Sequence, residues 1–287
     1  MRSRAGGGGA VRLQDRVVIL TGASRGIGRA LARRLFREGC RLVLVARSHT
    51  GLAGLAETAG LGSSAALVSG DVADPATASR AVGEALARFG RVDILVNNAG
   101  VGLRAPVAGL DPDDFRRVVE VNVAGALNFI RETVPHLVDR GEGLVVNMAS
   151  VVARQTVPFL GGYAATKAAL VALSDALRVE LSGTGVGVLT VLPGSVETGF
   201  RAAARGEPYP ERAGAVRLSP EQVAEEVVRA MRSGRPPRNL YILSRGERLG
   251  LFLGRLFPRL VEAGLMRRYG TEGGMGTGPP GGPGRGT

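Results

Sequence analysis

The chain of 287 residues has no tryptophan, one cysteine and two histidines. The single cysteine, Cys40, excludes an internal disulfide framework, and such sparse use of cysteine is typical of a reducing compartment. Because Cys40 stands beside an apolar run, we expect it to fill space in the core rather than to act as a nucleophile. His49 and His136 lie far apart in the sequence. We expect surface or structural roles for both histidines, and no metal site.

Long hydrophobic runs are also missing. No apolar segment of a secretion signal is found in the N-terminal stretch MRSRAGGGGAVRLQDR, and no later run is long enough to span a bilayer. A cytoplasmic location is therefore expected. Glycine gathers at residues 6–9, and glycine and proline gather at the other end, which predicts a flexible tail over residues 1–13 and a disordered tail over residues 270–287. Between the tails we expect one domain over residues 14–243 and an apolar, basic extension over residues 244–269.

Lysine is nearly absent: of the 37 basic residues, 36 are arginines and one is Lys167. With 25 acidic residues the formal charge is +12, which raises the question of a nucleic-acid partner. Much of the excess lies between Arg229 and Arg268, where ten arginines accompany only Glu247 and Glu262. No zinc-ligand spacing, RNA-binding aromatic motif or basic zipper pattern accompanies this charge. We therefore expect no nucleic-acid partner.

What the sequence does contain is a regular alternation of short apolar runs and longer helical patterns. The runs are rich in Val, Ile and Leu, as in strands covered on both faces. They read RVVILTG, RLVLVAR, AALVSGD, VDILVNNAG, GLVVNMAS, VGVLTVLPG and, more weakly, NLYIL. Helical periodicity is found over residues 26–38, 75–89, 112–138, 162–182 and 219–233. The alternation predicts an α/β fold: a doubly wound parallel sheet of about seven strands with helices on both faces, the Rossmann arrangement.

Three glycines mark the turn after the first run, in TGASRGIG at residues 21–28. Gly22, Gly26 and Gly28 lack a Cβ, so that backbone N–H groups and the amino end of the next helix can approach a pyrophosphate. Glycine also serves simple turns, but this place between a strand and a helix favours dinucleotide binding.

The end of the second run bears on which dinucleotide binds. NAD sites place an acid here for the ribose 2′-hydroxyl, whereas this chain has Ala46 and Arg47. Arg47 can offer a bidentate fork to a 2′-phosphate, and Arg25 in the glycine turn can provide a second cation. Arginine is common in this chain, so both can also be simple surface residues. Because the acid is missing, the pattern favours NADP(H) over NAD(H).

Further motifs follow in order: GDV at 70–72, NNAG at 97–100, VN at 121–122, Ser150, YAATK at 163–167 and PGSVET at 193–198. Together with TGASRGIG, they make residues 14–243 resemble a single-domain short-chain dehydrogenase/reductase of the NADP(H)-preferring type. The resemblance implies a Rossmann-fold oxidoreductase that transfers a hydride between a nicotinamide and a carbonyl or carbinol carbon.

Tyr163 and Lys167 are four residues apart in a helical pattern, so they share one face of the helix. A tyrosine hydroxyl titrates near about pH 10, and a nearby ammonium lowers its pKa toward the range of a general acid or base. Lysine suits this place as a compact charge with rotatable donors, which the larger planar fork of arginine does not replace. The resemblance implies that Tyr163 is the proton donor and that Lys167 also binds the nicotinamide ribose. It further implies that Ser150 hydrogen-bonds the substrate carbonyl and that Asn122 supports a water-linked proton relay to Lys167.

The same resemblance assigns residues to the cofactor cleft. Asp71 and Val72 match a segment that contacts the adenine ring, Thr198 matches a residue that reaches the carboxamide, and Asn97 is expected to stabilise the sheet and line the cleft. The full set expected to bind the cofactor is Gly22, Ser24, Arg25, Gly26, Ile27, Gly28, Arg47, Asp71, Val72, Asn98, Ala99, Gly100, Tyr163, Lys167, Pro193, Gly194, Val196 and Thr198.

The C-terminal extension departs from the family pattern. It lacks a DGG-like ending and contains LGLFLGRLFPRLVEAGLMRRY at residues 249–269, divided by Pro258. One interpretation packs its apolar face on the domain or on a subunit partner, with the arginines in solvent. The other is an amphipathic element that touches an anionic membrane surface or covers a lipid-like substrate pocket. Residues 199–218, where relatives carry a substrate lid, have the composition of a mobile loop.

These patterns favour a hydrophobic ketone or alcohol as the substrate. A 3-oxoacyl-thioester reductase is the alternative among enzymes, since a basic surface suits an acidic carrier, although the missing DGG ending counts against it. A cofactor-binding sensor or scaffold is the alternative outside enzymes, and the presence of Ser150, Tyr163 and Lys167 counts against that. The resemblance implies a homodimer or homotetramer built on the helices around 112–138 and 162–182.

Overall fold

The structure is a computed structural model that describes residues 12–208, 217–233 and 236–269. Within these residues, the main sheet has seven parallel strands in the order β3-β2-β1-β4-β6-β7-β9. The strands are β1 (Val17–Thr21), β2 (Arg41–Ala46), β3 (Ala65–Ser69), β4 (Ile94–Asn97), β6 (Gly143–Met148), β7 (Val186–Pro193) and β9 (Asn239–Ile242). Each of the apolar runs forms one of them, which confirms the predicted parallel sheet. The predicted tails fall mainly outside the described residues, as do residues 209–216 of the predicted lid.

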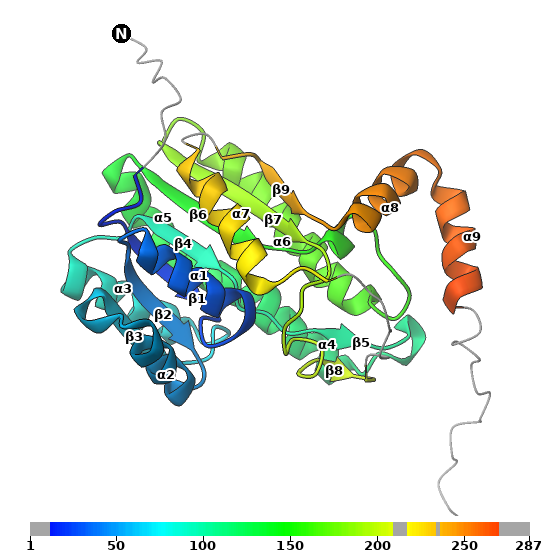
Figure 1. Ribbon diagram of the computed structural model, residues 1–287, viewed down its shortest axis with the longest axis horizontal. Helices are drawn as coiled ribbons and strands as arrows, with labels where there is room; N and C mark the ends of the chain where they lie inside the picture. Colours follow the sequence, from blue (N-terminus) through cyan, green and yellow to red (C-terminus); the bar gives the residue numbers. More distant parts are fainter. Residues whose placement is uncertain (1–11, 209–216, 234–235, 270–287) are drawn as a thin grey trace, which may run out of the picture.

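Helices cover both faces of the sheet (Figure 1). The core helices are α1 (Gly26–Arg37), α2 (His49–Ala59), α3 (Pro75–Phe89), α4 (Pro112–Val119), α5 (Gly125–Arg140), α6 (Gly161–Glu180) and α7 (Pro220–Arg232). Successive side chains of a strand point to opposite faces, so Val18 packs under the layer of α1 and α7 while Ile19 packs under α3 and α5. The predicted doubly wound α/β fold is confirmed.

The sheet order reverses beside β1, between β2 and β4. In open α/β sheets, ligands bind outside the carboxyl ends of the strands at this reversal. The loops that leave β1, β4, β6 and β7 therefore define where a site belongs.

Two helical segments differ from the prediction. The pattern at 112–138 is divided by a π-helical turn at Glu120–Ala124. This turn places the side chain of Asn122 where it hydrogen-bonds the backbone of Val101. Helix α2 was not predicted, because its glycines at 51 and 54 weaken helix propensity. It forms because Leu52 and Leu55 are buried under it and because Ser48 accepts a hydrogen bond from the Gly51 N–H.

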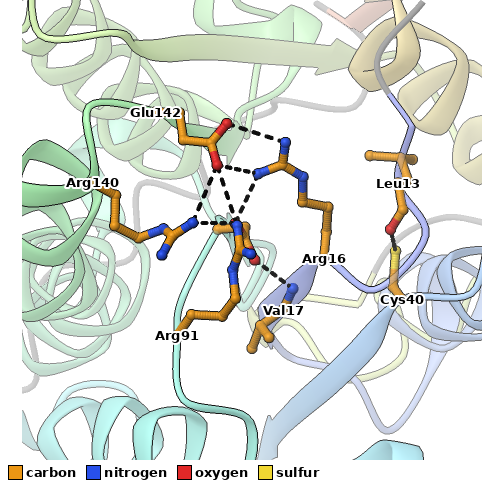
Figure 2. Close-up of polar contacts among 8 residues, drawn as sticks. Leu13, Arg16, Val17, Cys40, Arg91, Arg140 and Glu142 are labelled. Atoms are coloured by element: carbon orange, nitrogen blue, oxygen red, sulfur yellow. Dashed lines mark hydrogen bonds and ion pairs between the residues drawn. The ribbon is translucent and has the colours of Figure 1, made fainter.

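A cluster of charged side chains ties together the amino ends of β1, β4 and β6 (Figure 2). Asp93 is buried, accepts the Val17 N–H at 2.9 Å and pairs with Arg16 at 2.9 Å and with Arg91. Arg16 also binds Glu142 at 2.7 Å, and this bond is the main cause that lowers the pKa of Glu142 to about 2. These ends of the strands lie opposite the carboxyl ends, so the cluster belongs to stability rather than to the site.

Cys40 lies in the core at the start of β2, as predicted. Its thiol donates to the Leu13 carbonyl oxygen at 3.3 Å (Figure 2). Burial raises the pKa of this thiol to about 12, so Cys40 stays a thiol at neutral pH.

The C-terminal extension forms two further helices, α8 (Arg245–Leu256) and α9 (Pro258–Tyr269). Figure 1 shows both in orange beyond the edge of the main body. Pro258 starts α9 and separates it from α8, because proline lacks the N–H that a continuous helix needs. Among the described residues, no helix has the length and hydropathy required to cross a membrane.

Candidate active site

The carboxyl ends of the central strands border a cleft of about 1200 Å³. Its walls include every residue that the sequence assigned to cofactor binding, from the glycine turn after β1 to the loop after β7. Ser150, Tyr163 and Lys167 line the same cleft. Asn122, the fourth residue of the predicted catalytic set, does not line the cleft and lies behind its wall. The fold thus gathers residues from the whole length of the domain into one place.

The glycine turn after β1 has no room for side chains. Gly22 and Gly26 adopt positive φ values of +66° and +51°. A Cβ on Gly22 would stand 2.8 Å from the Ala99 Cα, and one on Gly28 would collide with the Gly22 carbonyl oxygen. Helix α1 begins at Gly26, and its N-cap Arg25 makes no side-chain bond to the helix. Its first N–H groups therefore face the cleft, and this cradle fits the pyrophosphate of a dinucleotide.

Arginines gather at the end of the cleft next to β2. Arg25 and Arg47 are exposed there. Asp71, after β3, pairs with Arg117 of α4. Burial alone would raise the pKa of Asp71, but the Ala73 N–H and Arg117 outweigh it and hold that pKa below its usual value. Since Asp71 is already engaged, the forks of Arg25 and Arg47 stay available to a phosphate.

At the other end, Tyr163 and Lys167 lie one turn apart on α6, with the Lys167 Nζ 5.8 Å from the centre of the tyrosine ring. Lys167 is 3% exposed, and its Nζ donates to the Met148 carbonyl oxygen at 2.8 Å. Burial lowers the pKa of Lys167 to about 8. The ammonium is thus poised to change charge close to neutrality, next to a tyrosine in the cleft.

Asn122 holds the wall behind this pair. Its Oδ1 accepts the Val101 N–H at 2.8 Å, and its Nδ2 donates to the Val101 carbonyl oxygen and to Thr166, both at 3.0 Å. A Cβ on Gly100 would meet the Asn122 Oδ1 at 3.2 Å and the Lys167 Nζ at 3.4 Å. Gly100 thus lets the amide and the ammonium approach the same stretch of backbone.

Asn97 does not line the cleft, contrary to the prediction. It is the last residue of β4 and is 4% exposed, and its Nδ2 donates to the Asn147 Oδ1 at 2.9 Å. Its side chain points under α5, because the alternation along β4 places it on that face of the sheet. Asn97 therefore supports the sheet, as also predicted, and its neighbour Asn98 faces the cleft.

Ser150 follows β6 and accepts the Val152 N–H at 3.4 Å. Next to it the cleft is mainly apolar: the ring of Phe200 lies 5.6 Å from that of Tyr163, and Val151, Val157 and Leu160 complete the wall. A hydroxyl and a phenol that face an apolar pocket beside a dinucleotide cradle can bind a carbonyl oxygen by hydrogen bonds, and the phenol can give it a proton or take one from the alcohol.

A family model described as short chain dehydrogenase matches residues 16–208. The chain is a short-chain dehydrogenase/reductase. The predicted membership of the short-chain dehydrogenase/reductase family is thereby confirmed, and the oxidoreductases of this family act on CH–OH or C=O groups.

Its relatives include Ketoacyl reductase HetN of Nostoc sp., which is 35% identical over 77% of this chain and 77% of that protein. A short chain dehydrogenase/reductase from Burkholderia phymatum, in complex with NAD, is 29% identical and has a TM-score of 0.77, covering 87% of this chain and 96% of its own. A short chain dehydrogenase from Burkholderia cenocepacia, in complex with NADP, is 26% identical with a TM-score of 0.74, covering 89% and 99%.

This short-chain dehydrogenase/reductase also has cleft residues that the sequence analysis missed, above all Glu247 in the first turn of α8. Its Oε1 accepts the Ser195 N–H at 2.6 Å, and its Oε2 accepts from the Ser244 N–H and hydroxyl at 2.9 and 2.8 Å. The carboxylate occupies the space where Gly194 would carry a Cβ. The spacing Ser244-x-x-Glu247 is that of a capping box, a signal that could have placed the start of α8.

Helix α9 reaches the cleft of the enzyme from the same side. Tyr269 lines the cleft, and its ring lies 6.3 Å from that of Phe159. Gly254 of α8 packs against the Gln155 amide. The inner side of the extension thus forms part of the cleft wall.

Proposed function

We propose that this enzyme is an NADP(H)-dependent oxidoreductase that interconverts a hydrophobic ketone and its alcohol, with Tyr163 as the general acid and base. The observation that carries the proposal is the buried Lys167, held against Tyr163 in a cleft that also contains the glycine cradle. A nicotinamide cofactor, when bound, supplies or accepts the hydride.

The residues of the chain handle the proton and the orientation. Tyr163 gives the proton of its hydroxyl to the substrate oxygen in the reductive direction and takes it back in the other. The Lys167 ammonium favours the tyrosinate form electrostatically and so eases this exchange. Ser150 donates a hydrogen bond to the same substrate oxygen and holds the carbonyl in place.

Asn122 acts through Lys167 rather than on the substrate. Its amide bonds to Val101 and Thr166 hold α6 against the loop after β4. We assign it to the support of Lys167 and of the proton path behind it.

Preference for NADP(H) is supported by charge at the far end of the cleft. Arg47 and Arg25 are exposed there, whereas the nearby carboxylate of Asp71 is engaged by Arg117. A 2′-phosphate adds charge-assisted bonds to such a site. The apolar wall formed by Val151, Val157, Leu160 and Phe200 supports a hydrophobic substrate.

The test is oxidation of NADPH and of NADH against a panel of apolar ketones, with wild type and Tyr163→Phe. We expect turnover with NADPH, weaker turnover with NADH, and loss of turnover in Tyr163→Phe while NADPH still binds. If both proteins bind NADPH and neither turns over any ketone, the proposal fails in favour of the cofactor-binding sensor.

A second candidate is reduction of 3-oxoacyl thioesters. It is favoured by the relative named Ketoacyl reductase HetN. Acetoacetyl thioesters belong in the same panel for this reason. A higher kcat/KM on them than on simple ketones would place this activity first.

A further inference from the structure

Exposed apolar side chains gather on the C-terminal extension. Thirteen large apolar side chains are exposed among the described residues, and seven of them lie on α8, on α9 or between the two helices. We call these seven the outer face: Leu249, Phe252, Leu253, Leu256, Phe257, Leu260 and Met266. Scattered apolar residues need no explanation, but such a concentration on two short helices marks an interaction surface.

The part of the outer face that lies on α8 points away from the cleft. On α8, Leu249, Phe252, Leu253 and Leu256 follow helical spacing and share one side of the helix. Glu247, which binds Ser195, and Gly254, which contacts Gln155, stand on the opposite side. Helix α8 is therefore fixed to the domain by its inner side, and its apolar stripe is left to solvent. The interpretation that this stripe packs on its own domain is wrong for the outer face.

Positive charge surrounds the outer face. Arg248, Arg255 and Arg259 are exposed beside it. Of the two carboxylates in the extension, Glu247 is held by Ser195 and Ser244, which leaves Glu262 as the exposed acid. Apolar groups flanked by arginines match a surface that combines hydrocarbon with negative charge.

We propose that the outer face binds the surface of an anionic lipid membrane. The phenylalanine and leucine side chains lie at the boundary of headgroups and acyl chains, and the arginines pair with lipid phosphates. Helices of 12 residues each lie on a membrane rather than cross it, since crossing takes about 20 apolar residues.

A second copy of the chain fits the same face less well. In a two-fold symmetric contact the same patch meets itself, so the arginines of one outer face would oppose those of the other. Like charges set against each other in this way weaken association. The anionic membrane removes this conflict, because it supplies the countercharge.

The location of the cleft agrees with this arrangement. Gly250 lines the cleft from the inner side of α8, so a membrane bound to the opposite side of α8 lies across this helix from the cleft. An apolar ketone of the proposed function partitions into lipid and would reach the cleft from there. The membrane binding itself rests on the outer face alone and is independent of the reaction.

The experiment is flotation of the full chain with vesicles of phosphatidylcholine alone and of equal parts phosphatidylcholine and phosphatidylglycerol. The variant Phe252→Ser/Leu256→Ser tests the apolar arm, with Val179→Ser/Leu86→Ser as its control at exposed apolar positions elsewhere. The variant Arg255→Gln/Arg259→Gln tests the charge arm, with Arg37→Gln/Arg131→Gln as its control at exposed arginines. NADPH binding, followed by fluorescence, checks that each variant is folded.

We expect wild type and both controls to float with the anionic vesicles, more weakly at high salt. Each outer-face variant should bind them about tenfold less, because affinity follows buried apolar area and lipid charge. Absence of flotation in wild type overturns the proposal, as does equal flotation with both vesicle types. A third result also overturns it: wild type does not float with vesicles, and it is an oligomer that dissociates in the variant Phe252→Ser/Leu256→Ser. A second copy of the chain would then cover the outer face.

Discussion

The Glu247 carboxylate accepts a hydrogen bond from the backbone N–H of Ser195 at 2.6 Å, across 52 residues of sequence. Ser195 belongs to the loop after β7, which also carries Gly194 and Thr198, two residues that the sequence assigns to the cofactor. The C-terminal extension is therefore fastened to the loop that we assign to the nicotinamide end, through one carboxylate that also caps α8.

Replacement of Glu247 by alanine should weaken cofactor binding. The loss leaves the Ser195 N–H without its acceptor, which costs about 1–3 kcal/mol. We expect the KM for NADPH to rise by roughly tenfold, with a smaller effect on kcat, since about 1.4 kcal/mol corresponds to tenfold in affinity. Steady-state kinetics with varied NADPH measure it.

The matched control is Glu262→Ala, which removes an exposed carboxylate from α9. Glu247→Gln should restore part of the affinity, because its amide oxygen can still accept the Ser195 N–H. A lower melting temperature with an unchanged KM for NADPH would show that Glu247 serves only the stability of α8.

Lys167→Arg keeps the charge and should still abolish most of the activity. The Lys167 Nζ lies beside Gly100 and donates to the Met148 carbonyl oxygen, and the larger planar fork of a guanidinium does not reproduce this compact geometry. We expect kcat to fall by about 100-fold or more, the scale of general acid–base catalysis. Single-turnover reduction of a ketone by bound NADPH measures the chemical step. Near-normal turnover would mean that charge alone matters.

The free energy of unfolding should depend on pH through Lys167. Burial lowers its pKa from 10.5 to about 8 in the folded state, so the unfolded state binds more protons between these values. The penalty for burying the ammonium is complete below about pH 8 and disappears as the pH rises to 10.5. Its size is on the order of 3 kcal/mol, at about 1.4 kcal/mol for each pKa unit.

Lys167→Met removes this penalty together with the bond to Met148. We expect the variant without cofactor to be about 2 kcal/mol more stable than wild type at pH 7, after a loss of about 1 kcal/mol for the hydrogen bond. Urea unfolding at a series of pH values should show this advantage disappearing and then reversing, to about 1 kcal/mol in favour of wild type, as the pH rises past 10.5. A constant difference across that range would contradict the lowered pKa.

Arg47→Asp should shift the enzyme toward NADH. The change removes a fork available to the 2′-phosphate and places an acid where NAD sites have one. We expect the ratio of kcat/KM for NADPH to that for NADH to fall by about 10- to 100-fold, the value of a charge-assisted bond. Arg88→Asp, an exposed arginine on α3, is the control. An unchanged ratio would mean that Arg47 is an ordinary surface residue with no role in the choice of cofactor.

Much of the fold and the cofactor cleft could be predicted because their signals are local in sequence. Tyr163 and Lys167 share a helix face by spacing, and Gly22 and Gly28 announce a turn that has no room for a Cβ. Each buried parallel strand is a continuous apolar run, so the sheet is readable before its order is known.

The features that escaped prediction depend on distant contacts. Helix α2 forms through the burial of Leu52 and Leu55 despite weak propensity, and the π-helical turn depends on what Asn122 meets across the fold. The bond of Glu247 to Ser195 requires the end of the chain to lie against the loop after β7. The sequence around Glu247 and around Ser195 contains no pattern that predicts their contact.

Lys167 is the one ε-amine in a chain of 287 residues, and it lies 3% exposed at the wall of the cleft. An amine-selective label, which modifies most proteins at random, has a single side-chain target here besides the α-amino group. The mass of one modified peptide then reports whether that wall is open or covered. The scarcity of lysine turns an ordinary surface reagent into a probe of the enzyme's interior.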